Sequence, residues 1–183
     1  MTRLSRHFVE KELSSLNCNK ATGLDQLAAC LLKDSAFYIS KPICYILNML
    51  ITTGTVPKLW KSAKFMPILK SRSAELPQNY RPISVLPVLS KILEKSIHSQ
   101  LLSYLERNKL LSEYQFGFRK HRSTKMAATL LCDHIRKEMN NGNMVGVIYL
   151  DLSKAFDTIG HGLLINKLTS YGVSGHELEW FTD

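Results

Sequence analysis

The residue best placed for chemistry is Asp151, which follows a nearly continuous apolar run from Met144 to Leu150. Such a run predicts a strand that is covered on both faces, and ligands of α/β folds collect where these strands end. A carboxylate there can hold Mg²⁺, a hard ion that prefers oxygen ligands, and the carbonyl oxygen of Leu152 is a possible second ligand. The alternative is that Asp151 caps a short helix beginning near Ser153. For an isolated Leu-Asp-Leu-Ser segment, capping is the better interpretation.

Other catalytic arrangements are not indicated. Asp157 lies six residues after Asp151, about 240° around a helix, so the two carboxylates would not share a helix face. His161 has no Ser, Cys or carboxylate partner at an informative spacing, and the sequence contains no G-x-x-x-x-G-K-[ST] phosphate loop. The four cysteines match no zinc template, so we expect free thiols in a reducing compartment.

Positive charge is concentrated in the middle of the chain. The 183 residues carry a formal net charge of +9. Fourteen of the basic residues, against four acidic ones, lie between Lys58 and Lys125. Aromatic residues are interleaved with them: Tyr80, Tyr104, Tyr114, Phe116 and Phe118. This combination suits a phosphate backbone with stacked bases, although a set of solvated helix faces would also explain it.

The elements around these residues are predicted by hydrophobic periodicity and by capping residues. The length allows one domain, or one domain and part of another, and the most apolar stretch, 43–51, is too short to span a membrane. Helices are expected over 7–16, up to Lys33, over 36–51, 88–107, 123–139 and 163–171, and from Glu177 onward. Strands are expected over 64–69 and 83–86, paired as a hairpin, and over 144–150. The segment 113–122 is expected to be a loop.

Several motifs together resemble the reverse transcriptases of non-LTR (LINE-type) retrotransposons. They are Lys-Ala-Thr-Gly-Leu-Asp at 20–25, Val-Pro-x-x-Trp-Lys at 56–61, Asn-Tyr-Arg-Pro-Ile-Ser-Val-Leu-Pro at 79–87, Ser-Lys-Ile-Leu-Glu-Lys at 90–95, Gln-Phe-Gly-Phe-Arg at 115–119, and Asp-Leu-Ser-Lys-Ala-Phe-Asp-Thr at 151–158. Each motif is weak alone, but their order and spacing are specific.

The resemblance implies an α/β (α+β), helix-rich, right-hand polymerase fold: an N-terminal extension over 1–20, fingers over 21–143 and the start of the palm over 144–183. Asp151 and the carbonyl of Leu152 would then bind metal, with Asp151 catalytic. Arg81, Lys70 and Phe156 would contact the incoming dNTP, with Phe156 excluding a 2′-hydroxyl. Lys91, Arg119 and Arg122 would contact nucleic acid.

The same resemblance implies an RNA template, a DNA primer, dNTP and two Mg²⁺ (or Mn²⁺) ions, no membrane association, and an intracellular, nuclear location. It makes no prediction of oligomeric state. No Asp-Asp pair occurs in the sequence, and the thumb is expected to be absent. One carboxylate of the expected three cannot assemble a two-metal site, so the chain alone is predicted to be inactive. The alternative function is a non-catalytic nucleic-acid-binding remnant.

Overall fold

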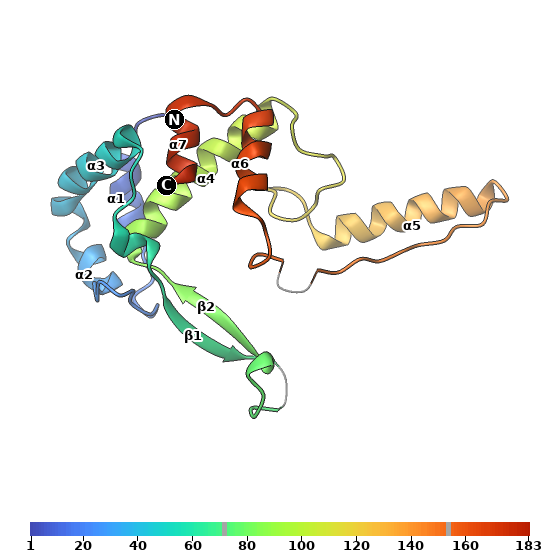
Figure 1. Cartoon of the computed structure of the whole chain (residues 1–183), viewed down its shortest axis with the longest axis horizontal. Helices are drawn as coiled ribbons and strands as arrows, with labels where there is room; N and C mark the ends of the chain where they lie inside the picture. The colour runs from blue at the N-terminus through green and yellow to red at the C-terminus, as the bar shows by residue number, and fades with distance from the viewer. Residues whose placement is uncertain (71–72, 153–154) are drawn as a thin grey trace. The chain divides into compact units, whose positions relative to one another are not determined.

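The computed structural model describes residues 1–70, 73–152 and 155–183, which form helices and one two-stranded sheet (Figure 1). The helix-rich α+β class agrees with the prediction. The chain divides into two compact units: Met1–Ser103 together with Leu168–Asp183, and Tyr104–Lys167. This division concerns compactness, and the predicted boundary between fingers and palm after residue 143 stays a prediction.

The first unit holds most of the helices. They are α1 (Arg6–Ser14), α2 (Ala29–Asp34), α3 (Ala36–Thr53), most of α4 (Val88–Arg107) and α7 (Gly175–Thr182). Helices α1, α2 and α3 contact one another. Their apolar faces form one core with α4: Val9, Leu13, Ala29, Leu32, Ala36, Ile43, Cys44, Leu47, Leu50, Ile51, Val88, Ile92, Leu93 and Ile97. Within the described residues, no helix is both long and apolar enough to span a membrane.

The helix ends follow the local sequence. The Ser5 hydroxyl accepts a hydrogen bond from the Phe8 N–H and caps α1. Helix α3 ends at Gly54, whose φ of +68° is the left-handed conformation that glycine adopts without strain. The predicted stop at Gly54 is therefore confirmed, and the helix itself ends at Thr53, two residues after its predicted end.

The N-terminal segment is held by two side-chain amides. Asn48 of α3 accepts a hydrogen bond from the Leu4 N–H (2.7 Å) and donates one to the Leu4 carbonyl (3.0 Å). Gln100 of α4 does the same for Thr2, at 2.6 and 3.0 Å. Because these contacts involve only the backbone of residues 2 and 4, they fix an extended segment largely independently of its side chains.

The sheet is an antiparallel hairpin of β1 (Lys64–Leu69) and β2 (Tyr80–Val85), which extends away from the helices of its unit (Figure 1). It is preceded by the 3₁₀ turn η1 (Lys58–Lys61), and η2 (Pro77–Asn79) leads into β2. The predicted pairing is confirmed, and β2 begins three residues earlier than expected.

Two prolines disfavour the pairing of a third strand with this hairpin. Pro67 lies opposite Pro82. Because the Lys70 N–H bonds to the Asn79 carbonyl (2.6 Å), the alternation of an antiparallel ladder makes the proline pair a non-hydrogen-bonded one. At such a position the backbone nitrogen points outward. Both edges therefore lack a donor at the same level, which disfavours a third strand there.

The second unit contains α5 (Thr124–Asn140), and α6 (His161–Ser170) crosses from it into the first unit along the chain. The predicted cap of α5 is confirmed, since the Ser123 hydroxyl accepts a hydrogen bond from the Met126 N–H at 3.3 Å. None of the described residues of this unit is buried. Its helices are therefore not organised around a core of their own.

The prediction of a strand over 144–150 is wrong. These residues form no strand, and Leu150 is 90% exposed. The apolar run predicts a strand that is covered on both faces of a sheet, but β1 and β2 pair only with each other in the described chain. A single extended segment is not stable as a strand without partners, so it lies as an extended loop after the turn at Asn141–Asn143.

Candidate nucleic-acid and nucleotide interface

One face of the hairpin combines apolar side chains with exposed cations. Strand alternation and register place Lys64, Met66 and Ile68 on the same face as Arg81, Ile83 and Val85. Arg81, opposite Ile68, is exposed, as is Lys64 at the other end of the face. Lys70, also exposed, directly follows β1. No ion pair joins these three cations to another of the described residues, so such long side chains on a projecting ribbon can reach an anionic ligand.

Two of the sequence motifs meet at the base of the hairpin. A Cβ built on Gly23 would lie 2.6 Å from the backbone nitrogen of Pro87 and 2.8 Å from its Cα. Only glycine permits this approach of the two backbones. The Thr-Gly-Leu-Asp turn is thus packed against the end of the Asn-Tyr-Arg-Pro-Ile-Ser-Val-Leu-Pro motif, where the chain passes from β2 into α4.

Arg119 has internal partners. Its Nη1 donates to the Ser112 carbonyl at 2.9 Å, and its Nε lies 3.5 Å from a carboxylate oxygen of Glu106. The side chain is only 15% exposed. Its neighbours Phe118 and His121 have φ values of +59°, a conformation that costs non-glycine residues about 1–3 kcal/mol. Arg119 therefore holds a strained loop against the end of α4.

The other residues that are predicted to contact nucleic acid or dNTP near this loop are Arg122 and Phe156. The Arg122 guanidinium lies over the Phe116 ring, 5.2 Å from its centroid. Phe156 is 77% exposed and meets Phe118 edge to face, with ring centroids 6.1 Å apart. Within the second unit, the structure therefore brings the predicted sugar-contacting ring, Phe156, to the Gln-Phe-Gly-Phe-Arg loop. Lys91, in the first unit, is exposed on α4.

Asp151 is exposed in a segment without regular structure, and Leu152 is 75% exposed. The alternative role of Asp151, capping a helix near Ser153, concerns residues partly outside the described ones, and residues 155–157 form a turn. Among the described residues, no three His, Cys, Asp or Glu side chains are grouped to hold a metal ion. Mg²⁺ requires near-octahedral oxygen coordination. One carboxylate does not supply it, so these residues do not fit a two-metal site.

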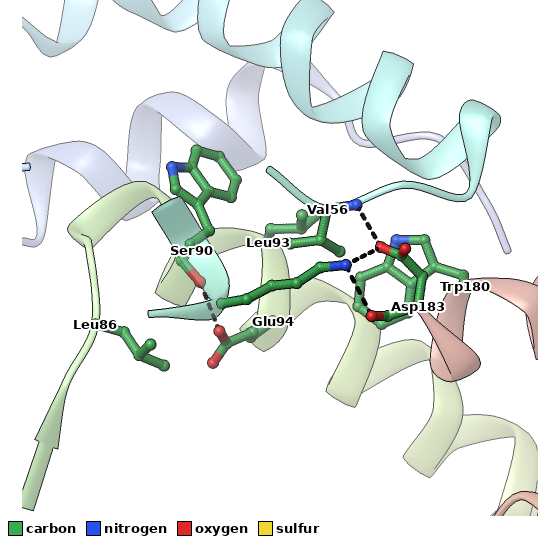
Figure 2. Close-up of a pocket in the computed structure, with 9 residues that line it drawn as sticks. Val56, Leu86, Ser90, Leu93, Glu94, Trp180 and Asp183 are labelled. Atoms are coloured by element: carbon green, nitrogen blue, oxygen red, sulfur yellow. Dashed lines mark hydrogen bonds and ion pairs between the residues drawn. The ribbon is translucent and has the colours of Figure 1, made fainter. Parts of the chain in front are cut away.

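The first unit also contains a pocket of about 290 Å³, shown in Figure 2. Its lining residues are Val56, Trp60, Lys61, Leu86, Ser90, Leu93, Glu94, Trp180 and Asp183. None of the predicted site residues lines it. The indole nitrogen of Trp180 is buried and has no hydrogen-bond partner among the described residues.

An ion pair crosses one side of this pocket. Lys61 Nζ lies 2.6 Å from the Asp183 carboxylate, which also accepts a hydrogen bond from the Val56 N–H at 2.9 Å (Figure 2). These contacts lower the pKa of Asp183, the hydrogen bond from Lys61 being the larger cause and that from the Val56 N–H the next. The pKa of Glu177 is lowered mainly by its hydrogen bond to the N-terminal ammonium group of Met1. Both groups tie α7 to the rest of the first unit.

Sequence reasoning missed several of these residues. The sequence indicates Trp60 only as part of the Val-Pro-x-x-Trp-Lys motif. That Trp60 and Trp180 line one pocket has no local signal, because the two residues lie far apart in the chain. The pairing of Arg119 with Glu106 was missed for the same reason. For Lys64 the local signal is incomplete: alternation within β1 groups it with Met66 and Ile68, but the register with β2 is needed to place it on the Arg81 face.

Comparison with known proteins gives the family. The profile of the family described as "Reverse transcriptase (RNA-dependent DNA polymerase)" matches residues 68–183. The chain is 30% identical over 178 residues, or 93% of its length, to the probable RNA-directed DNA polymerase from transposon BS of Drosophila melanogaster. It is 32% identical over 163 residues (87% of the chain) to the RNA-directed DNA polymerase from mobile element jockey of the same species.

A third relative is the Pol polyprotein from retrotransposable element R2 of Popillia japonica, 28% identical over 120 residues, which is 66% of the chain and 16% of that protein. The chain spans 20% and 18% of the BS and jockey proteins, respectively. The matched residues include β2, the Arg119 loop and Asp151. The resemblance deduced from the motifs is thereby confirmed: the chain belongs to the reverse transcriptase (RNA-dependent DNA polymerase) family, among relatives from non-LTR retrotransposons.

Proposed function

We propose that this chain is the fingers region and the first part of the palm of a reverse transcriptase, and that it binds a template–primer duplex and the incoming dNTP. The family match over residues 68–183 carries this proposal. It is supported by the hairpin, whose cations are exposed, and by relatives that are named RNA-directed DNA polymerases.

The hairpin would bind the triphosphate. Arg81 can form paired hydrogen bonds to phosphate oxygens, and Lys70 adds a second positive charge beside it. Positioning and charge neutralisation, rather than covalent chemistry by the protein, dominate phosphoryl transfer. Phe156 would exclude a 2′-hydroxyl by steric clash. Lys91 and Arg122 would contact nucleic-acid phosphates, while Arg119 would contribute by shaping its loop.

Asp151 would be one carboxylate of a divalent-metal site, with the Leu152 carbonyl as a neighbouring ligand. The family's nucleotidyl transfer generally depends on divalent metal, and the bound ions would supply charge for the reacting phosphate. Since the described residues do not fit a two-metal site, we derive no catalytic step from them. The 183-residue chain is therefore proposed to bind its ligands without polymerising.

The test combines binding with primer extension. The purified chain should bind an RNA–DNA hybrid with an affinity that falls steeply as salt rises, because bound cations release counterions from phosphates. Arg81→Ala and Arg122→Ala should weaken this binding and flatten its salt dependence, whereas Lys11→Ala, on α1, should not. With Mg²⁺ or Mn²⁺ and an RNA template, no primer extension is expected. Extension by the purified chain would contradict the proposed inactivity.

A non-catalytic nucleic-acid binder is the second candidate function. It is favoured by the excess of fourteen basic over four acidic residues between Lys58 and Lys125. The two functions differ in nucleotide binding. If dNTP protects the hairpin from exchange or cleavage and Arg81→Ala abolishes the protection, the polymerase assignment stands. Salt-dependent hybrid binding without any dNTP effect would favour the simple binder.

A further inference from the structure

Helix α3 presents a row of exposed side chains opposite its buried face. Tyr38, Lys41, Tyr45 and Met49 follow a spacing of 3, 4 and 4 residues, which places them on one side of the helix. Tyr38 is 79% exposed and Tyr45 is 73% exposed. The buried residues of α3, such as Leu47, lie on the opposite side. We call Tyr38, Lys41, Tyr45 and Met49 the α3 stripe.

The composition of the stripe is unusual for a solvent-facing surface. The outer face of an amphipathic helix normally carries charged and polar residues. Helix α3 contains no Asp or Glu, and Lys41 is its only charged residue. Exposed aromatic residues in a row, rather than scattered singly, indicate a binding surface.

Neighbouring side chains hold one end of the stripe in place. The Phe37 ring meets Tyr38 edge to face at 5.4 Å between centroids. The Arg6 guanidinium lies over the Phe37 ring at 5.4 Å and donates to the Phe37 carbonyl (3.2 Å) and the Ser40 hydroxyl (3.1 Å). Arg6 thus adds a second cation near Tyr38, part of whose charge is offset by Glu10 at 3.7 Å.

We propose that the α3 stripe is a binding platform for single-stranded nucleic acid. Along the helix, a tyrosine, a lysine and a second tyrosine follow one another at successive turns. In this order each ring can stack on a base, and the lysine between them can pair with a phosphate. Proteins that bind single strands combine aromatic rings for stacking with cations for the backbone. Charge selects this occupant: α3 has no acidic residue, and the cations beside its rings are Lys41 and Arg6, which suits a polyanion better than an uncharged partner.

The platform lies outside the residues matched by the family profile, and it shares no residue with the hairpin or the Arg119 loop. The inference deepens the proposed nucleic-acid-binding function by adding a surface for an unpaired strand. Stacking tolerates any base, so the platform would bind RNA or DNA with little sequence preference.

The experiment measures binding of the full 183-residue chain to fluorescent oligo(dT) and oligo(U) by anisotropy. Tyr38→Ala and Tyr45→Ala should each weaken single-strand binding about 5- to 100-fold, whereas Tyr38→Phe and Tyr45→Phe should keep the affinity because the ring is retained. Lys41→Ala should lower the slope of log affinity against log salt by about 0.7. Leu31→Ala removes another exposed side chain, on α2, and serves as the matched control.

A second measurement does not depend on the variants folding. Oligo(U) that contains 4-thiouridine should crosslink to the wild-type chain at Tyr38 or Tyr45 on irradiation, as located by mass spectrometry. Unchanged affinity in both Ala variants, or crosslinks confined to other elements, would overturn the proposal and leave the stripe as a protein contact.

The hybrid-binding assay separates the two proposals. If hybrid binding by the wild-type chain depends on Arg81 and Arg122 but the tyrosine variants leave single-strand binding unchanged, only the platform is refuted. If the wild-type chain binds no hybrid at all, the proposed function itself fails, whatever the tyrosine variants show.

Discussion

Arg119, which is predicted to contact nucleic acid, also organises the loop that presents the other predicted contacts. Its hydrogen bond to the Ser112 carbonyl and its proximity to Glu106 hold a loop in which Phe118 and His121 are strained. Arg119→Ala should therefore lower the free energy of local opening by about 1–2 kcal/mol, because a charged hydrogen bond is lost. In hydrogen exchange, amides of the loop should exchange roughly 5- to 30-fold faster.

Lys120→Ala is the matched control for this prediction. Lys120 is exposed beside Arg119 and makes no hydrogen bond or ion pair recorded in the described chain. Its replacement should leave loop exchange unchanged. Were Arg119→Ala to lower nucleic-acid affinity without faster exchange, Arg119 would be a direct contact, as the sequence first indicated.

Gly23 gives a second prediction at the residue scale. A methyl group there would collide with the Pro87 backbone, which cannot move as a flexible side chain would. Gly23→Ala should therefore destabilise the first unit by about 1–3 kcal/mol, the usual cost of overpacking. Thermal unfolding measures the change. Gly162 lies in α6 with open space around it, so Gly162→Ala should raise the stability of the protein or leave it unchanged. Equal effects of the two substitutions would contradict the close approach of Gly23 and Pro87.

At the scale of elements, local signals predicted most of the structure. The long helices α3, α4 and α5 follow from periodic apolar residues with Ser123 and Gly54 at their ends, because these cues act within one or two turns. The hairpin was also predicted. The strand over 144–150 was not realised, because a strand exists only with partners elsewhere in space. The same limit applies to the site: Asp151 was recognised by its motif, but its surroundings depend on contacts that no local pattern encodes.

The docking of α7 leads to a pH prediction. Asp183 has a pKa below its ordinary value because of Lys61 and the Val56 N–H. A lowered folded-state pKa contributes stability that is present above the unfolded-state pKa and is lost as pH falls through the folded-state pKa. The first unit should therefore lose stability below about pH 4, and Asp183→Asn should remove part of that dependence.

Lys61→Met supplies the control for the ion pair. It should lower stability at neutral pH at least as much as Asp183→Asn does, because it also removes the 2.8 Å hydrogen bond from Lys61 Nζ to the backbone oxygen of Asp183. The double variant should lose little more than Lys61→Met alone, since the ion pair is already broken. Thermal melts at pH 3 and pH 7 measure this. Additive losses in the double variant would show that Lys61 and Asp183 act independently.

At the scale of the whole molecule, the two units differ in how much apolar surface they bury. The first unit has a core to which four helices contribute, including Leu13, Leu47 and Leu93, which are almost fully buried. In the second unit none of the described residues is buried. Protection from hydrogen exchange depends on buried contacts and on hydrogen bonds shielded from water, so the two units should not open with the same free energy.

Hydrogen exchange along the whole chain tests this difference. Amides of α1, α3 and the first turns of α4 should be the slowest to exchange, and those of α5 should be faster. Residues 144–150 should exchange at close to the intrinsic rate, because they form no strand. Slow exchange over 144–150 in the isolated chain would show that this segment had found a strand partner, and the apolar run before Asp151 would then be positioned as the sequence predicted.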